Sequence, residues 1–231
     1  MSTIRTNLQA VQGHIAEAAQ SASRSPDTVC LLAVSKTCPA QTVIEAARAG
    51  QHAFGENYEQ EAIRKMQQIR EMAPDLRLEW HFIGPIQSNK TRGIATHFDW
   101  VHTIDRERIA RRLSEQRPET LPPLNVCLQV NISNEDSKSG IDEKGLFELA
   151  KTVSNLPRLK LRGLMAIPEP EDEPEKQHEP FRRLKNLYNQ MRKAGYDLDT
   201  LSMGMTADMD AAIAEGATIV RIGTAIFGAR N

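Results

Sequence analysis

Cysteines and aromatic residues are scarce in this sequence, and neither sign of charge is in excess. Three cysteines occur among 231 residues, and aromatic residues make up 5%. An odd cysteine count without paired spacing does not form a disulfide framework. We therefore expect Cys30 and Cys127 to be buried in apolar runs and Cys38 to be more accessible, all three structural. The 29 basic and 30 acidic residues offer no electrostatic footprint for nucleic acid.

Long apolar runs are also lacking. No stretch is apolar enough to cross a membrane, and residues 1–20 lack the basic and apolar regions of a signal peptide. From these absences we expect a soluble, cytoplasmic protein without membrane or nucleic-acid partners.

What the sequence does contain is a regular alternation of short apolar segments and helical patterns. Ile4–Ala19 has apolar residues at helical spacing and begins the chain as an amphipathic helix. The segments expected to form strands are Val29–Ser35, His52–Phe54, Glu79–Ile83, Trp100–Thr103, Leu124–Asn131, Leu159–Leu164, Thr200–Ser202 and Thr218–Ile222. The helices expected between them are Ala40–Ala49, Tyr58–Met72, Ser88–His97, Asp105–Gln116 with Asp105 as N-cap, Asp142–Asn155, Glu175–Ala194 and Ala207–Ala214, with Gly50, Gly195 and Gly216 as terminators.

Strict alternation of strands and helices implies parallel pairing with helical crossovers. Eight such units predict an α/β fold, a single (β/α)8 TIM barrel with an extra N-terminal helix. We expect one domain over residues 1–231, with residues 1–24 packed outside the barrel. An open doubly wound sheet is the alternative, disfavoured because no Gly-x-Gly-x-x-Gly turn follows the first strand.

Chemistry in such barrels lies at the carboxyl ends of the strands. Lys36 follows the first strand and shares its parity with Leu32 and Val34. An amine beside apolar walls becomes nucleophilic and suits Schiff-base chemistry, whereas a lysine that reaches solvent is the ordinary alternative.

The ends of the last two strands have the composition of an anion site. Ser202, Gly204 and Thr206 follow the seventh strand, and Gly223 and Thr224 follow the eighth. Hydroxyls, glycine backbone and helix N-termini bind phosphate in barrels, although each loop alone also fits an ordinary turn.

Arg221 lies inside the apolar eighth strand and needs a partner. The alternatives are an ion pair with a barrel carboxylate such as Glu79 or a contact to a ligand. His52, His81 and His102 lie in or near strands and are expected to be core residues, without metal-ligand spacing. The acidic segment Pro168–Pro180 is interpreted as a solvated loop, with a mobile lid as the alternative.

Several motifs together resemble the YggS/PROSC family of pyridoxal phosphate homeostasis proteins. The matching segments run nearly end to end and are Leu32-Ala33-Val34-Ser35-Lys36-Thr37, Phe54-Gly55-Glu56-Asn57-Tyr58, Trp80-His81-Phe82-Ile83-Gly84, Gln87-Ser88-Asn89-Lys90, Ser202-Met203-Gly204-Met205 and Val220-Arg221-Ile222-Gly223-Thr224. This resemblance implies a fold similar to the N-terminal barrel of bacterial alanine racemase and pyridoxal 5'-phosphate (PLP) as the cofactor.

The resemblance also implies a role for individual residues. Lys36 forms the Schiff base, and Arg221 approaches the pyridine nitrogen. Asn57 lies near the cofactor. The phosphate is held by Ser202, Gly223 and Thr224, with backbone help from residues 203–206, which include Met203, Gly204 and Thr206. Thr206 departs from the more usual serine but keeps the hydroxyl.

An arginine at the pyridine nitrogen cannot accept a proton from it, so the cofactor is expected to be a weak electron sink. The sequence ends at Asn231, and we expect the added domain that supplies a second base in the related racemase to be missing. The expected function is thus a monomeric PLP-binding carrier or regulator in vitamin B6 homeostasis, without efficient turnover, with apo-PLP enzymes as recipients. A single-domain amino-acid racemase using Tyr58 is the alternative, and a barrel enzyme that forms a Schiff base with a sugar phosphate is a third.

Overall fold

The computed structural model describes residues 3–133, 139–171 and 173–229. In this part of the chain, eight parallel strands form a closed barrel in the order β1 to β8. The strands are β1 Cys30–Val34, β2 Ala53–Glu56, β3 Glu79–Phe82, β4 Trp100–Ile104, β5 Leu124–Gln129, β6 Leu159–Met165, β7 Thr200–Ser202 and β8 Ile219–Ile222. The predicted barrel is confirmed, and each strand lies within two residues of its predicted bounds.

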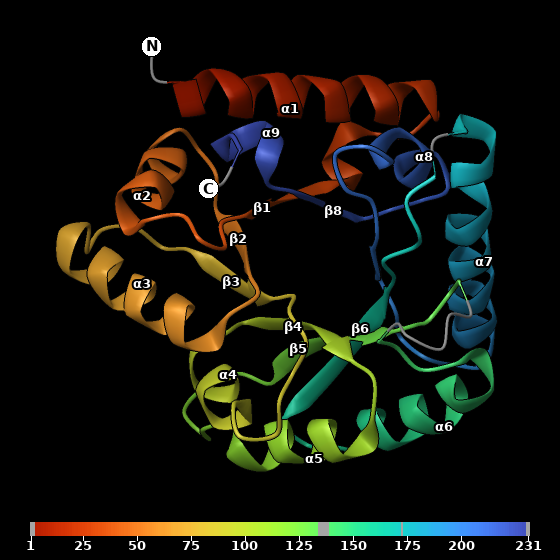
Figure 1. Cartoon of the computed structure of the whole chain (residues 1–231). Coiled ribbons are helices and arrows are strands. Elements are labelled where there is room, and N and C mark those ends of the chain that lie inside the picture. Colours follow the sequence, from red (N-terminus) through yellow and green to blue (C-terminus); the bar gives the residue numbers. More distant parts are fainter. Residues whose placement is uncertain (1–2, 134–138, 172, 230–231) are drawn as a thin grey trace.

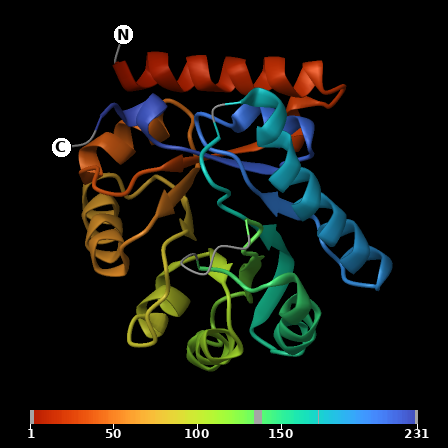
Figure 2. The ribbon, with the colours of Figure 1, turned by 45° about the vertical axis from the view of Figure 1, so that its right-hand side comes forward.

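Helices surround the barrel as an outer ring (Figure 1). They are α2 Ala40–Arg48, α3 Glu59–Met72, α4 Thr91–His97, α5 Glu107–Gln116, α6 Glu143–Ser154, α7 Pro174–Lys193 and α8 Met209–Ala214. The N-terminal helix α1, Thr3–Ser21, lies outside the ring along α8 and α9 (Figures 1 and 2). None of the helices in the described residues is both long and apolar enough to span a bilayer.

Strand alternation divides the core into two layers. The outward-facing side chains, such as Phe54 and Val101, pack against the helices, whereas Leu32 and Val34 join a cluster inside the barrel. The glycines predicted to end helices, Gly50, Gly195 and Gly216, all have positive φ, which a glycine adopts without steric cost.

Some local predictions were wrong. Asp105 does not cap α5, because the helix begins two residues later, with Arg106 as its N-cap. Cys30 is exposed and Cys38 is buried, the reverse of the accessibility expected for both. His52 is exposed and is not a core residue.

Two short elements and the start of α7 refine the predicted order. The 3-10 helix Pro26–Thr28 precedes β1, and helix α9, Thr224–Phe227, follows β8, where the sequence suggested no further element. The acidic segment is only partly a loop, since α7 begins at Pro174 and contains Pro180.

Candidate functional site

Lys36 lies in the turn that follows β1 and is partly buried. The strand before it pairs with β8, and Leu32 is in register with Arg221. The next register pair is Ala33 with Ile222, so the chain reaches Lys36 on one strand and Gly223 and Thr224 on the other at the same rim. Closure of the barrel therefore brings together residues that are almost 190 positions apart in the sequence.

The turn that carries Lys36 is hydrogen-bonded to an ionic cluster formed by Lys65, Glu56 and Glu61. Lys65 Nζ donates to the Ser35 carbonyl oxygen at 2.7 Å, to Glu56 Oε1 at 2.7 Å and to Glu61 Oε1 at 2.9 Å. Glu61 Oε1 in turn accepts the backbone N–H of Thr37 at 2.7 Å. The residues on both sides of Lys36 are thus hydrogen-bonded to one cluster, which limits the positions open to its side chain.

The same cluster stabilises an unusual backbone conformation. Thr37 has φ of 63°, a left-handed conformation that β-branched residues rarely adopt. Glu56 is fully buried, and the Ser35 hydroxyl also donates to it at 2.6 Å. Burial raises the pKa of Glu56, and the neighbouring Lys65 ammonium acts in the opposite direction.

Lys65 was not predicted from the sequence, although a signal for it was present. Lys65 lies on the buried face of α3 together with Ala62, Met66 and Ile69, which recur at helical spacing. A lysine at a core position of an amphipathic helix needs a buried partner. Glu56, at the end of β2 in a motif that was already singled out, is that partner.

Arg221 projects into the barrel, where it is 5% exposed. Its guanidinium donates to Ser202 Oγ at 2.9 Å and to the Ala166 carbonyl oxygen at 2.9 Å, both uncharged acceptors. Burial lowers the pKa of Arg221 to about 10, so the side chain stays cationic at neutral pH.

Ser202 occupies a different position from the one expected of a phosphate ligand. Its side chain is fully buried, and its hydroxyl lies between Arg221 and His102, 2.7 Å from His102 Nδ1. The hydroxyl group is therefore already used inside the barrel, and the structure makes Ser202 a neighbour of Arg221 and not a surface group at the rim.

The other predicted phosphate residues do lie at the rim. Thr206 and Thr224 are exposed and Gly223 is partly exposed. Met203 is buried in the core, and only its backbone belongs to the loop. Gly204 has φ of 96°, and its carbonyl oxygen accepts the Arg221 N–H at 3.0 Å, which ties the loop after β7 to β8. A side chain at Gly204 would meet Ala212 Cβ at 2.6 Å.

Asn57 follows β2 at the same end of the barrel and is partly buried. Its Oδ1 atom is buried and has no hydrogen-bond partner. A buried amide oxygen without a partner, at the end of the barrel where Lys36 lies, fits a site that receives a polar ligand. Tyr58, the next residue, is 56% exposed.

Lys90 and Lys138 also follow strands in the sequence and are further candidates for reaction with an aldehyde. Lys90 Nζ lies 3.6 Å from Glu59 Oε2 in an ion pair. Lys138 lies outside the described residues.

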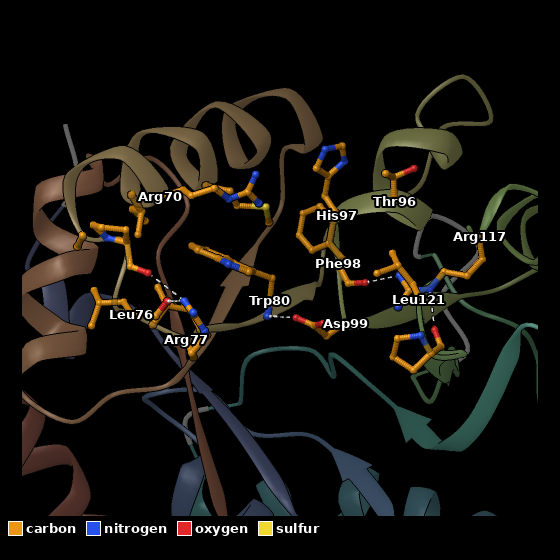
Figure 3. A pocket seen from close by; sticks show the side chains of 16 residues that line it. Arg70, Leu76, Arg77, Trp80, Thr96, His97, Phe98, Asp99, Arg117 and Leu121 are labelled. Atoms are coloured by element: carbon orange, nitrogen blue, oxygen red, sulfur yellow. Dashed lines mark hydrogen bonds between the residues drawn. The ribbon is translucent and has the colours of Figure 1, made fainter. Parts of the chain in front are cut away.

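A separate cleft of about 390 Å³ lies at the opposite end of the barrel, beside the amino-terminal ends of β3 and β4. Several basic side chains line it, together with Trp80 and Asp99 (Figure 3). Arg117 donates there to the carbonyl oxygens of Ala95, Phe98 and Pro122. The hydrogen bonds of this cation fix the loops around it. The cleft includes none of the predicted cofactor residues.

Comparison with known proteins identifies the class to which this barrel belongs. Residues 6–231 match the family described as "Alanine racemase, N-terminal domain". The racemase of Corynebacterium glutamicum shares this fold, with a TM-score of 0.67 at 19% identity over 99% of this chain and 61% of that chain.

More similar relatives narrow the class. The pyridoxal phosphate homeostasis proteins of Pseudomonas aeruginosa and of Escherichia coli K12 are 61% and 56% identical over 231 residues, which cover 100% of this chain and 97% and 98% of theirs. PipY of Synechococcus elongatus, solved with PLP bound, is 37% identical with a TM-score of 0.80 over 93% of this chain and 100% of that chain. The chain belongs to the family of pyridoxal phosphate homeostasis proteins.

Proposed function

We propose that this chain binds PLP at the carboxyl-terminal rim of the barrel and serves the homeostasis of that cofactor. The observation that carries the proposal is the pairing of β1 with β8, which brings Lys36, Arg221 and the loop at Gly223 to one rim. The orphaned Oδ1 of Asn57 at that rim supports it independently. PipY, the relative solved with PLP, supports the choice of ligand.

Within this site, Lys36 would form the covalent link. Its amine would add to the aldehyde carbon of PLP, and the carbon–oxygen bond would break as water leaves, so that amine and aldehyde would give a Schiff base and water. The cluster behind this partly buried turn holds the backbone on both sides of Lys36. When bound, PLP supplies an electrophilic aldehyde and an electron-withdrawing ring.

The phosphate group would lie against the exposed hydroxyls of Thr206 and Thr224 and the backbone at Gly204 and Gly223. Helix α9 begins at Thr224, and the first N–H groups of a helix have no acceptor within it. Asn57 offers its amide to a polar substituent of the ring.

Arg221 would face the ring nitrogen, with Ser202 as the residue that positions the guanidinium rather than as a phosphate ligand. Because an arginine donates and does not accept, the nitrogen stays unprotonated and the ring withdraws electrons weakly. We therefore infer a binding protein without efficient turnover.

Trapping with borohydride tests the covalent link. Protein loaded with PLP should show a visible absorbance band, and after reduction the peptide that contains Lys36 should carry the added mass. Lys36→Ala should lose both signals. Lys90→Ala, which removes another lysine beyond a strand end, is the matched control and should keep them. Retention of a reduced adduct at the rim in Lys36→Ala would overturn the assignment.

We further propose that the protein is a monomer in the cytoplasm and passes its PLP to apo-enzymes. In the part of the chain that the structure describes, the exposed large apolar residues belong to several different segments: Tyr58, Met72, Leu121, Phe147, Ile167 and Met205. Light scattering should give the mass of one chain. Loaded protein should reactivate an apo-PLP enzyme faster than free PLP held at the concentration that the protein releases.

A further inference from the structure

A row of polar side chains crosses the inside of the barrel from one end to the other. At the amino-terminal end of β3, Glu79 Oε1 lies 2.7 Å from His81 Nε2. His81 Nδ1 lies 2.9 Å from His102 Nε2, and His102 Nδ1 lies 2.7 Å from Ser202 Oγ. Ser202 Oγ accepts from Arg221 at 2.9 Å. The row therefore connects a half-exposed carboxylate to the arginine of the proposed cofactor site.

When both histidines are neutral, the two ends of the row determine the direction of every hydrogen bond in it. A guanidinium can only donate, and an ionised carboxylate can only accept. Ser202 accepts from Arg221, so its O–H is free to donate to His102 Nδ1, and His102 Nε2–H then donates to His81 Nδ1. His81 Nε2–H finally donates to Glu79. This assignment satisfies each group and makes both histidines neutral Nε2–H tautomers.

The surroundings agree with a neutral His102 and an ionised Glu79. Burial holds the pKa of His102 well below its usual range, with His81 and Arg221 acting in the same direction. The hydrogen bond from His81 lowers the pKa of Glu79. The other charged groups near His81 are Asp99 and Arg162, and Arg162 lies over the Trp100 ring that stacks on His81.

We propose that Ser202, His102, His81 and Glu79 form a directional relay that positions Arg221 for the ring nitrogen of the bound cofactor. The proposal rests on the proposed function, because it takes Arg221 as the contact to that nitrogen. Glu79 is then the terminal acceptor of the row, connected to Arg221 through three intervening side chains and not by a direct ion pair. The four are positioning residues and do not themselves touch the cofactor.

The test uses Glu79→Gln, which replaces the terminal acceptor by an amide that can also donate. Glu215→Gln is the matched control, because Glu215 also accepts from a histidine, His178 at 2.9 Å, but on the outside of the barrel. Ring nitrogen shifts of ¹⁵N-histidine-labelled protein report the tautomers, with His102→Gln and His81→Asn to assign the signals. Titration with PLP, followed by its visible band, reports affinity.

We expect Nε2–H tautomers for both histidines in the unsubstituted protein. Glu79→Gln should mix the tautomers of His102 and weaken PLP binding by about fivefold, the effect of one hydrogen bond. Glu215→Gln should change neither. An Nδ1–H tautomer at His102 would overturn the relay, and an unchanged affinity in Glu79→Gln would overturn its link to the cofactor. Failure of the unsubstituted protein to bind PLP would instead overturn the proposed function, while the tautomers would still decide the relay.

Discussion

The ammonium group of Lys65 lies 2.7 Å from the carbonyl oxygen of Ser35, the residue immediately before Lys36. A helix residue on the outside of the barrel is thereby bonded to the backbone of the turn that carries the candidate Schiff-base lysine. The cation is 4% exposed, and its partner Glu56 is fully buried. This contact fixes the backbone next to Lys36. The ammonium group of Lys65 itself is paired with the carboxylates of Glu56 and Glu61.

Lys65→Met should destabilise the protein strongly, because it leaves the Glu56 carboxylate buried without its cation. Removal of one partner from a buried ion pair costs about 3–5 kcal/mol. Denaturation with urea measures the loss. The double variant Lys65→Met with Glu56→Gln should be more stable than Lys65→Met alone, since it also removes the unpaired charge.

Arg111→Met is the control for this prediction, since Arg111 pairs with Glu107 in a half-exposed i,i+4 contact on α5. Exposed pairs contribute at most about 1 kcal/mol. Equal losses for Lys65→Met and Arg111→Met would contradict a structural role for the buried cluster.

Gly204→Ala should destabilise the loop after β7 more than Gly195→Ala destabilises the end of α7. Both glycines have φ of 96°, so the backbone strain that an alanine introduces is the same at the two positions. Only at Gly204 would the added Cβ meet a neighbour, Ala212 Cβ at 2.6 Å, and such overpacking costs about 1–3 kcal/mol more. Thermal or urea unfolding of the two variants gives the difference, and PLP affinity should fall only for Gly204→Ala.

Arg221→Gln should weaken PLP binding, because it removes a charged donor from the proposed ring-nitrogen contact. Hydrogen bonds to charged groups contribute about 1.5–3 kcal/mol, which corresponds to roughly ten- to a hundredfold in the dissociation constant. Arg117→Gln is the comparison, because Arg117 is also buried, at 4% exposure, but donates to backbone carbonyls at the opposite end of the barrel. Arg117→Gln should lower the free energy of unfolding and leave PLP affinity unchanged. Equal losses of PLP affinity in the two variants would contradict the place of Arg221 in the site.

His102 should make the protein less stable in acid. Burial places its pKa in the folded protein well below the usual 6.5. Below that pH the unfolded chain binds a proton at His102 that the folded chain does not. His102 therefore leaves the free energy of unfolding unchanged above about pH 6.5 and lowers it progressively as the pH falls below that value. The slope from this one group is about 1.4 kcal/mol per pH unit.

Urea denaturation at a series of pH values, from neutral down to about pH 5, isolates this effect by comparison with His102→Gln. The variant should lose that part of the slope, while the groups common to both proteins titrate alike. Parallel stability curves for the two proteins would show that His102 is not the group responsible.

The order of elements could be predicted from the sequence because periodicity and glycine terminators act locally. β7 was predicted with the bounds that the structure has, and β3 with one residue more. Caps were less predictable: Asp142 caps α6 through the Gly145 N–H, but Asp105 does not cap α5. Both aspartates fit the same local rule, and the surrounding chain decides which of them reaches a free N–H group.

The candidate site was predictable to the extent that residues at strand ends gather at one rim. Lys36, Asn57, Thr206 and Thr224 were found in this way. Ser202 looked equivalent to them, but it is the last residue of β7 and faces inward, beneath Arg221. An ion pair of Arg221 with a carboxylate such as Glu79 was one of two alternatives, and it is not found: Ser202, His102 and His81 lie between the two charged groups.

By itself the sequence determined which residues form strands and which motifs end each strand, because these follow from local spacing. Only the tertiary structure decided which inward-facing groups meet. Glu79 and Arg221 come from β3 and β8, and no local pattern connects them. Closure of the barrel brings side chains of distant strands into one enclosed space, where each buried polar group must find a hydrogen-bond partner, and that requirement selects the partners.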